Sequence, residues 1–363
     1  MDDNRTAAEY AISGNLSITS PSFVSPTFKA NSSEYLKHKE FYESAKKITG
    51  LYLFPIICIL GIIGNVLTFI VFIKIKPRSS TTVFLTTLAI SDTIKLVCDF
   101  LYFIVVCLEK TGHTTISHQT FVALYPYAHY TLNFSLCNTA WLTVAVAVER
   151  YIYMKWPERA NTICTVTRST ITCCIIWLSS MLVAIPFVLR YKHYPKEDGT
   201  IDITVSPLWQ ITEFTDAYVW VQNILRSIIP LIVLVILNAW IIRALSRLSK
   251  RHMAPPPCKM RATSMLVAMI MAFLVCITPD AVLSAVFGFG YTDAPMMIKG
   301  IREISDVLLS LNSAINFFLY FTFNKIFRQK LSKLLCPKRD PCRTKPRRKQ
   351  QWMLIKDGKE GVT

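Results

Sequence analysis

Charged residues are scarce in this chain. They make up 17% of its 363 residues, whereas soluble proteins carry about a quarter. The apolar residues, 52% of the chain, gather in several runs of about 18 residues or more, each long enough to cross a bilayer as a helix. The composition therefore excludes a soluble enzyme, a nucleic-acid-binding protein and a disordered scaffold, and it indicates a helical membrane protein.

The sequence also lacks the common catalytic and metal-binding motifs. It has no nucleophile elbow, no CxxC pair, no HExxH motif and no phosphate-binding loop. We therefore expect no enzymatic activity. The net charge of +17 does not call for a nucleic-acid partner, because basic residues in membrane proteins set orientation and contact anionic lipid.

The apolar runs predict seven membrane spans. They are Leu51–Ile75, Thr82–Cys107, Thr120–Tyr153, Ser169–Leu189, Tyr218–Leu245, Ala262–Phe289 and Met296–Phe323. The chain shows no internal repeat of 20–50 residues. We therefore expect one all-α membrane domain, a seven-transmembrane helix bundle over residues 51–323.

Basic residues predict the orientation of this bundle. Most of the 40 lysines and arginines lie after the first, third, fifth and seventh spans, and the side richer in them is normally cytoplasmic. Residues 1–50 should then be an extracellular tail, and they hold N-glycosylation triplets at Asn4, Asn15 and Asn31. Met1–Tyr10 is polar, so we expect no cleavable signal peptide and insertion into the plasma membrane through the first span.

Each span carries a landmark residue or motif. In chain order these are Gly64-Asn65, Leu88–Asp92, Glu149-Arg150-Tyr151, Trp177, Pro230, Pro279 and Asn316–Tyr320. With these landmarks, residues 51–335 resemble the rhodopsin-like (class A) G-protein-coupled receptors. Within that family they look most like the invertebrate FMRFamide, myosuppressin and myoinhibitory (sex) peptide receptors.

The resemblance extends beyond the seventh span. Residues 324–335 look like the short amphipathic helix that lies on the membrane surface in this family. Residues 336–363 would then be a basic cytoplasmic tail, attracted to anionic lipid of the inner leaflet. Cys336 is a candidate for palmitoylation, with an unmodified thiol as the alternative.

Some positions depart from the family and narrow the choice of ligand. Phe317 replaces the usual proline of the seventh-span motif, and Tyr125 replaces the usual cysteine at the outer end of span three. Ser310 stands where opsins have the retinal lysine, and Leu132 stands where amine receptors have an aspartate. The resemblance therefore implies neither an opsin nor an aminergic receptor.

The loop after the fourth span should be shaped without the family's disulfide. Arg190–Ala217 contains no cysteine, which agrees with the loss of the cysteine at Tyr125. Tyr191–Val205 alternates in polarity around the turn-rich segment Pro195–Gly199. This pattern predicts a β-hairpin.

The resemblance implies a polar pocket around Asp92 in the second span. Its other members would be Thr139, Asn312, Ser313 and Asn316. In the family such a pocket holds sodium and water and collapses on activation, and oxygen ligands suit a small hard cation. The alternative is a neutral, hydrogen-bonded aspartate that joins helices. We expect no other cofactor.

The resemblance also implies a switch that couples to the G protein. Arg150 would be held by Glu149 in the inactive state and released in the active one, with Tyr151 completing the motif. Further relay positions are Phe273, Asn316 and Tyr320. The alternative for Arg150 is an interfacial charge whose side chain reaches toward water.

Polar residues in the outer halves of the spans form the predicted ligand site, again by resemblance. They are Asp99, His129, Asn133, Gln222, Arg226, Asp280, Glu303 and Asp306. Arg226 can neutralise only one of Asp280 and Asp306, so a basic ligand group is expected to pair with the other. The alternatives are an internal ion-pair network without a ligand role and, for Asp99, a simple pair with Lys95 four residues earlier.

The sequence therefore predicts a cell-surface receptor that binds an extracellular ligand and activates a heterotrimeric G protein. An amidated neuropeptide with a basic side chain fits best. A receptor for a small molecule or a lipid is the alternative. A transporter or channel is more remote, because transporters usually contain paired repeats.

Glycosidase treatment should lower the apparent mass of the full-length protein on a denaturing gel, because the three triplets are expected outside the cell. Joint substitution of Asn4, Asn15 and Asn31 by Gln should abolish this shift. A shift that persists in the triple variant would place the glycans elsewhere.

Overall fold

The computed structural model describes residues 32–76, 78–112, 114–196, 199–250, 257–287 and 294–335. The glycosylation candidates Asn4, Asn15 and Asn31, the palmitoylation candidate Cys336 and the basic segment 336–363 lie outside the described residues.

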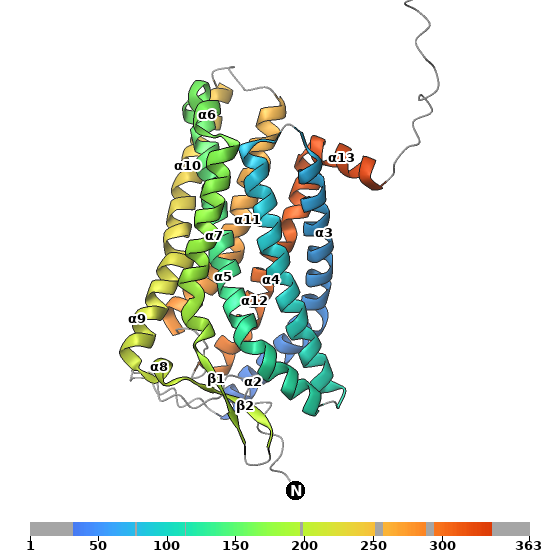
Figure 1. The fold of residues 1–363 in the computed structure, drawn as a ribbon, viewed down its shortest axis with the longest axis vertical. Helices are drawn as coiled ribbons and strands as arrows, with labels where there is room; N and C mark the ends of the chain where they lie inside the picture. The colour runs from blue at the N-terminus through green and yellow to red at the C-terminus, as the bar shows by residue number, and fades with distance from the viewer. Residues whose placement is uncertain are drawn as a thin grey trace, which may run out of the picture.

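Long helices stand side by side and form a bundle (Figure 1). They are α3 (Phe54–Lys74), α4 (Ser80–Lys110), α5 (Thr114–Lys155), α7 (Val166–Val188), α9 (Thr212–Asn223) with α10 (Ile229–Lys250), α11 (Pro257–Phe287) and α12 (Met296–Phe323). Each predicted span overlaps one of these helices, which confirms the seven-helix bundle. A π-helical turn, η2 (Ile224–Ile228), joins α9 to α10.

Length and composition fit a membrane bundle. Among the described helices, six are long and apolar enough to cross a bilayer. Helix α4 has the length, but Asp92, Lys95 and Asp99 interrupt its apolar run. Exposed leucines and isoleucines on the outside of the bundle, such as Leu182 and Ile175, suit a hydrocarbon environment.

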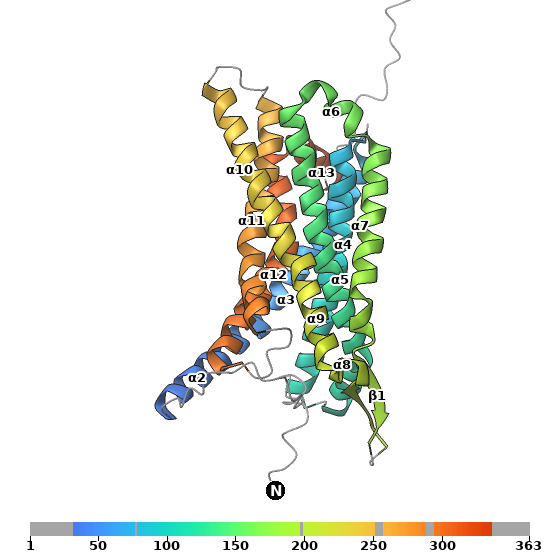
Figure 2. The same ribbon diagram turned by 90° about the vertical axis from the view of Figure 1, so that its left-hand side faces the viewer.

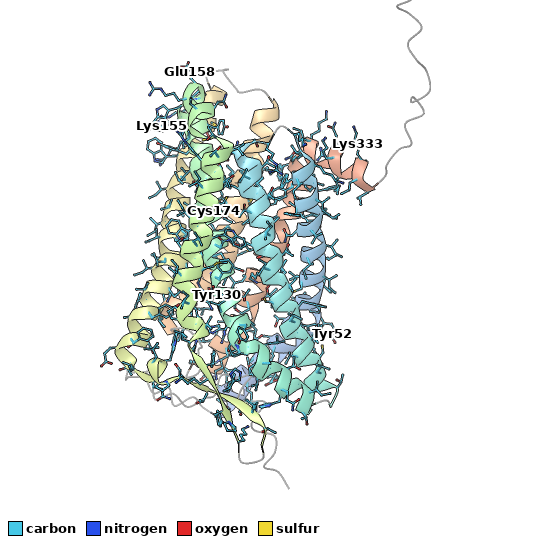
Figure 3. The ribbon with its side chains drawn as sticks, in the orientation of Figure 1. Tyr52, Tyr130, Lys155, Glu158, Cys174 and Lys333 are labelled. Atoms are coloured by element: carbon cyan, nitrogen blue, oxygen red, sulfur yellow. The ribbon has the colours of Figure 1, made fainter. Side chains whose placement is uncertain are left out.

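The two ends of the bundle differ (Figure 1). One end carries the strands β1 (Tyr191–Pro195) and β2 (Ile201–Val205) with the short helix α8 (Pro207–Gln210), and we call it the hairpin end. The opposite end carries α6 (Pro157–Ile163) and α13 (Lys325–Leu335), and we call it the α13 end. The labelled charged residues Lys155, Glu158 and Lys333 all lie at the α13 end (Figure 3).

The first helix is longer than the sequence analysis expected. The sequence predicts a tail over residues 1–50, whereas in the structure α2 (Ser32–Ile48) continues through the π-helical turn η1 (Thr49–Leu53) into α3. Helix α2 leaves the bundle at an angle (Figure 2) and packs on the start of α12. The contact depends on Gly300, where an added Cβ would lie 2.5 Å from the Phe41 ring.

The predicted β-hairpin is confirmed. Strands β1 and β2 pair antiparallel with Tyr191 opposite Val205, and Gly199 adopts a φ of 78° in the turn. That backbone region favours glycine because it has no Cβ. Lys196 in the turn and Asp202 in β2 form an ion pair of 2.5 Å.

Noncovalent contacts fasten this hairpin to α5. His118 lies 3.5 Å from the Asp202 carboxylate, and the His193 Nε2 atom is 3.2 Å from the Val122 carbonyl oxygen. Tyr125, at the family's cysteine position, packs edge-on against Tyr191 with ring centroids 5.2 Å apart.

The negative charge of Asp202 helps to hold the hairpin together and against α5. Burial alone raises the pKa of the Asp202 carboxyl. The hydrogen bonds from Lys196 and the Ile203 backbone, with the nearby charges of Lys196 and His118, outweigh burial and hold that pKa below its ordinary value. Because the pKa is depressed on folding, the stabilisation is present at neutral pH and is lost as the pH falls through the folded-state pKa.

The amphipathic helix predicted after the seventh span is also present. Asn324 caps α13, since its Oδ1 atom accepts a hydrogen bond of 3.0 Å from the Phe327 backbone N–H. Phe327 and Leu331 are buried, and the Phe327 ring lies 5.5 Å from that of Phe72 on α3. These contacts hold α13 across the end of the bundle.

Small residues let α3 approach its neighbours closely. A Cβ added at Gly61 would lie 2.6 Å from Leu96 Cδ1 and 2.7 Å from Ala314 Cβ. Gly50, in the turn η1, has nothing within 4 Å of such an atom. The α3–α4–α12 contact therefore has no room for another methyl group.

We expect Gly61→Ala to lower the melting temperature of the purified protein, because overpacking costs about 1–3 kcal/mol. Gly50→Ala is the matched control, and it should leave the melting temperature unchanged or slightly raised. Equal melting temperatures for the two variants would contradict the close packing at Gly61.

Candidate functional site

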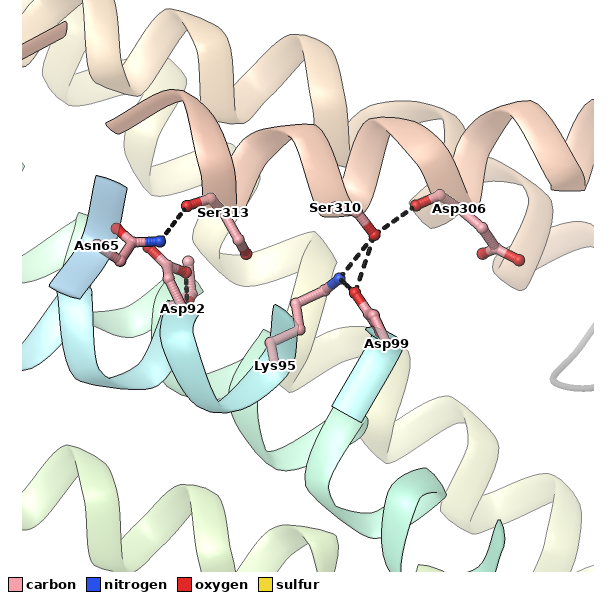
Figure 4. Close-up of polar contacts among 8 residues, drawn as sticks. Asn65, Asp92, Lys95, Asp99, Asp306, Ser310 and Ser313 are labelled. Atoms are coloured by element: carbon pink, nitrogen blue, oxygen red, sulfur yellow. Dashed lines mark hydrogen bonds and ion pairs between the residues drawn. The ribbon is translucent and has the colours of Figure 1, made fainter. Parts of the chain in front are cut away.

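Asp92 joins three helices near the middle of the bundle. Its carboxylate is fully buried. One oxygen accepts a hydrogen bond of 3.1 Å from the Thr139 hydroxyl on α5, and the other accepts one of 2.8 Å from the Asn316 amide on α12. A fourth helix is tied in beside it, because Asn65 on α3 donates to the Ser313 carbonyl oxygen at 2.8 Å (Figure 4).

The chemistry of this cluster fits a small cation. Asn312 and Ser313, the other predicted members, are buried in the same part of α12. Both partners of Asp92 are neutral donors, and among the described residues no ion pair involves its carboxylate. Carboxylate and hydroxyl oxygens are the ligands that a hard monovalent cation prefers, so these residue types suit the predicted sodium site.

A second polar cluster lies one turn nearer the hairpin end. Lys95 Nζ is 2.5 Å from Asp99 Oδ2, as the spacing of four residues predicts. Lys95 also donates to Ser310 Oγ on α12 at 3.1 Å, and Ser310 donates to Asp99 at 2.9 Å. These contacts close a buried ring between α4 and α12 (Figure 4).

Three predicted ligand residues meet in a third cluster. The Arg226 guanidinium, on η2, is 2.6 Å from Asp280 Oδ2 on α11 and donates to Asn133 Oδ1 on α5 at 3.2 Å. Ser284 donates to the other Asp280 oxygen at 3.4 Å. The Arg226 and Asp280 side chains are 6% and 11% exposed, so this is a buried charged network joining three helices.

The remaining predicted ligand residues on α5 and α9 lie closer to the hairpin. His129 stacks near Tyr125 and meets Phe187 edge-on at 4.7 Å, and its Nδ1 atom is buried without a hydrogen-bond partner among the described residues. Gln222 donates to the Tyr218 hydroxyl at 2.7 Å and to the Val183 carbonyl at 2.9 Å.

The two acids on α12 differ from the sequence expectation. Asp306 pairs with Arg302 at 3.6 Å, one turn away on the same helix, and both side chains are about two fifths exposed. Arg302 was not among the predicted partners of Asp306, although a spacing of four residues allows this pair. Glu303 lies within electrostatic reach of Arg302 and of Lys46 on α2.

A small apolar cavity lies beside the His129 cluster, since Tyr125 is among its lining residues. It measures about 110 Å³, lies between α4 and α5, and its lining includes Cys98, Val105, Phe121 and Leu124. Of the eight predicted ligand residues, none lines it.

Arg150 is held at the α13 end. Its guanidinium donates to the Thr81 hydroxyl at the start of α4 and to Glu149 Oε2 at 3.2 Å. It also lies over the Tyr153 ring, 5.1 Å from the centroid. Thr81 could not be predicted as a partner of Arg150, because an uncharged residue 69 positions away in the sequence gives no pairing signal. The contact ties α5 to α4.

The other switch candidates pack within the same half. Tyr151 accepts a hydrogen bond of 2.8 Å from Lys155 and meets Trp240 on α10 edge-on. Tyr320 is buried, with its hydroxyl 3.7 Å from Met269 Sδ on α11. Phe273 is buried in an apolar cluster that joins α5, α10, α11 and α12.

The sequence matches a known family and several receptors. The sequence model of the family described as 7 transmembrane receptor (rhodopsin family) matches residues 64–320. The chain is 27% identical to the FMRFamide receptor of Drosophila melanogaster, over 76% of this chain and 52% of the receptor. It is 25% identical to an FMRFamide peptide receptor of Caenorhabditis elegans, over 76% and 66% of the respective lengths.

A further match is a probable G-protein coupled receptor of Caenorhabditis elegans. It is 25% identical over 56% of this chain and 48% of the relative. The chain thus spans about half the length of this relative and of the Drosophila receptor. These matches confirm the resemblance that the span landmarks indicated.

Removing one member of the Arg226–Asp280 pair should destabilise the protein strongly. Arg226→Met and Asp280→Leu should each cost about 3–5 kcal/mol, because each leaves a buried charge without its partner. The double variant should cost clearly less than the sum, as measured by thermal melting of the purified protein. Arg302→Ala, at an exposed pair, is the control and should cost about 1 kcal/mol or less. Additive effects at Arg226 and Asp280 would contradict the pair.

Proposed function

The chain belongs to the rhodopsin family of seven-transmembrane receptors, and on this premise we propose that it binds an extracellular peptide and activates a heterotrimeric G protein. The α13 end would face the cytoplasm and the hairpin end the exterior, in the plasma membrane. Basic side chains such as Lys155 and Lys333 at the α13 end support this orientation.

The observation that carries the proposal is the contact of Arg150. The arginine lies near the end of α5, where Thr81 holds it against α4 and Glu149, on its own helix, binds it as well. An arginine with a hydroxyl and a single carboxylate oxygen as partners can change partners when the helices move. We therefore assign this arrangement to the resting receptor, and release of Arg150 would open the binding surface for the G protein.

The Asp92 cluster supports a second part of the switch. In the resting receptor it ties α4, α5 and α12 together, and a sodium ion bound by Asp92, Thr139 and Ser313 would strengthen that tie. Loss of the ion and closure of the pocket around Asp92 would favour the active arrangement. The positive charge of the ion would attract the oxygen atoms of these residues. Because the residues lie on different helices, this attraction would hold α4, α5 and α12 together.

A peptide ligand is supported by the hairpin end. The clusters around Arg226 and His129 lie in the part of the bundle nearer the hairpin, and they bring charged and aromatic side chains together there. Asp280 already has Arg226 as its partner, whereas the Asp306–Arg302 pair is partly exposed. A basic ligand side chain would therefore reach Asp306 or Glu303 first. Two of the relatives are receptors for FMRFamide or FMRFamide peptides by name, which favours an amidated peptide.

Arg150→Ala should reduce G-protein activation at least about tenfold while the receptor still reaches the cell surface, because the variant loses the group that changes partners. Guanine-nucleotide exchange in membranes is measured without ligand and with a panel of amidated peptides that end in Arg-Phe. Arg168→Ala, at the same end of the bundle, is the control and should respond as the wild type does. Normal signalling by Arg150→Ala would refute the assignment. If no peptide activates the wild type, the peptide part of the proposal fails, while exchange without ligand still tests coupling.

A further inference from the structure

The apolar cavity of about 110 Å³ between α4 and α5 opens on the outside of the bundle. Leu101, Leu124 and Tyr127 form its mouth, since they line it and are 40%, 36% and 61% exposed. Val105 and Phe121 form its floor, since they line it and are buried. Exposed side chains on the outside of a membrane bundle contact lipid, so the cavity is reached from the bilayer.

The cavity lies in the part of the bundle nearer the hairpin end. Ile203 of β2 packs in one apolar cluster with Val105 and Phe121 of the cavity floor. Tyrosines gather at the level where the hydrocarbon core meets the lipid headgroups, which suits Tyr127 at the mouth. The lipids beside the cavity therefore belong to the leaflet at the hairpin end.

The lining selects hydrocarbon over water. The Thr131 hydroxyl already donates a hydrogen bond of 2.7 Å to the Tyr127 carbonyl oxygen, and Cys98 adds only a weakly polar thiol. A trapped water needs about two to four polar partners, which this lining does not offer. A void left in its place would cost the surrounding side chains their dispersion contacts.

The size of the cavity narrows the choice of hydrocarbon. A cavity of about 150 Å³ holds one benzene molecule, and this one is smaller. The fused rings of a sterol are therefore too large, whereas a segment of a flexible straight chain fits.

We propose that this cavity binds the hydrocarbon chain of a phospholipid from the leaflet at the hairpin end. The site is separate from the predicted ligand residues, none of which lines it. The inference goes beyond the receptor function proposed above, because it needs only a chain that spans a membrane.

A bound chain would also support the hairpin. Phe121 stacks on Tyr125 with ring centroids 4.6 Å apart, and Tyr125 meets Tyr191 of β1 at 5.2 Å. Phe121 and Tyr125 line the cavity, so a chain bound there restricts both rings. The contacts of Tyr191 and Ile203 with α5 should then open less often.

Photo-crosslinking tests the site in nanodiscs that contain the full chain and a straight-chain phospholipid with a diazirine in its chain. The label should reach Val105 and Phe121, which bulk lipid does not touch because they are buried. Ala128→Leu fills the cavity from α5 and should lower this labelling at least about threefold. Cys98→Leu fills it from α4 and gives a second, independent variant. Ala123→Leu is the matched control, because Ala123 is exposed on α5 but does not line the cavity.

Labelling at Leu182, which is exposed on α7, serves as the reference for ordinary lipid contact and should be equal in all variants. Equal labelling of Val105 and Phe121 in the wild type and both filled variants would overturn the site. Labelling of these two residues by a diazirine sterol, but not by the phospholipid, would overturn the assignment of the occupant.

Hydrogen exchange of the hairpin amides tests the effect of the bound chain. In nanodiscs of phospholipids with methyl-branched chains, which are wider than straight chains, Tyr191–Val205 of the wild type should exchange about threefold faster than in straight-chain nanodiscs. Ala128→Leu carries its own filling and should exchange at the same rate in both lipids. Ala123→Leu should behave as the wild type does.

The outcomes of the exchange experiment are distinct from those of the signalling assay. Equal exchange of the wild-type hairpin in both lipids, or an equal difference in Ala128→Leu, would overturn the support of the hairpin by the chain. Neither experiment uses a ligand or a G protein. Failure of the proposed receptor function would therefore leave both results standing.

Discussion

A charged side chain in the middle of a bilayer costs about 2.5–3.5 kcal/mol on insertion scales, and the interior of this bundle is arranged around that constraint. Asp92 receives two hydrogen bonds, Asp99 receives Lys95, and Asp280 receives Arg226. Each of these clusters joins at least two helices. The polar groups that make the spans atypical are therefore also the groups that fix how the helices pack.

Helix α12 contributes residues to two of these polar clusters. Asn316 and the Ser313 carbonyl bind near Asp92, and Ser310 binds the Lys95–Asp99 pair. At the hairpin end of the bundle α12 meets α2 at Gly300, and at the α13 end it leads through Asn324 into α13. A shift of this helix changes contacts at both ends of the bundle and in its middle. If the proposed receptor function holds, α12 connects the ligand at the hairpin end with the G protein at the α13 end.

Local patterns predicted much of this structure. The spans follow from long apolar runs, the Lys95–Asp99 pair from a spacing of four residues, and the hairpin from alternation around a turn. Contacts between residues far apart in the sequence could not be predicted from such local patterns. That Arg226 pairs with Asp280, or that Arg150 contacts Thr81, depends on helix rotation and depth, which composition does not encode. Helix α2 was missed because its polar sequence has no apolar run, and its docking depends on one glycine on another helix.

The π-helical turn η2 has a consequence for comparing this chain with its relatives. A π-helical turn holds one residue more than an α-helical turn would, and one residue corresponds to about 100° of rotation around a helix. Suppose that this chain is aligned without a gap to a relative that lacks the η2 turn. Each residue of α9 is then matched with a residue of the relative that points to a different side of the helix. Gln222 and Tyr218, which face α7 here, would then be exchanged with residues that face lipid. An alignment of this region needs a one-residue gap at Ile224–Ile228 before residue roles are transferred.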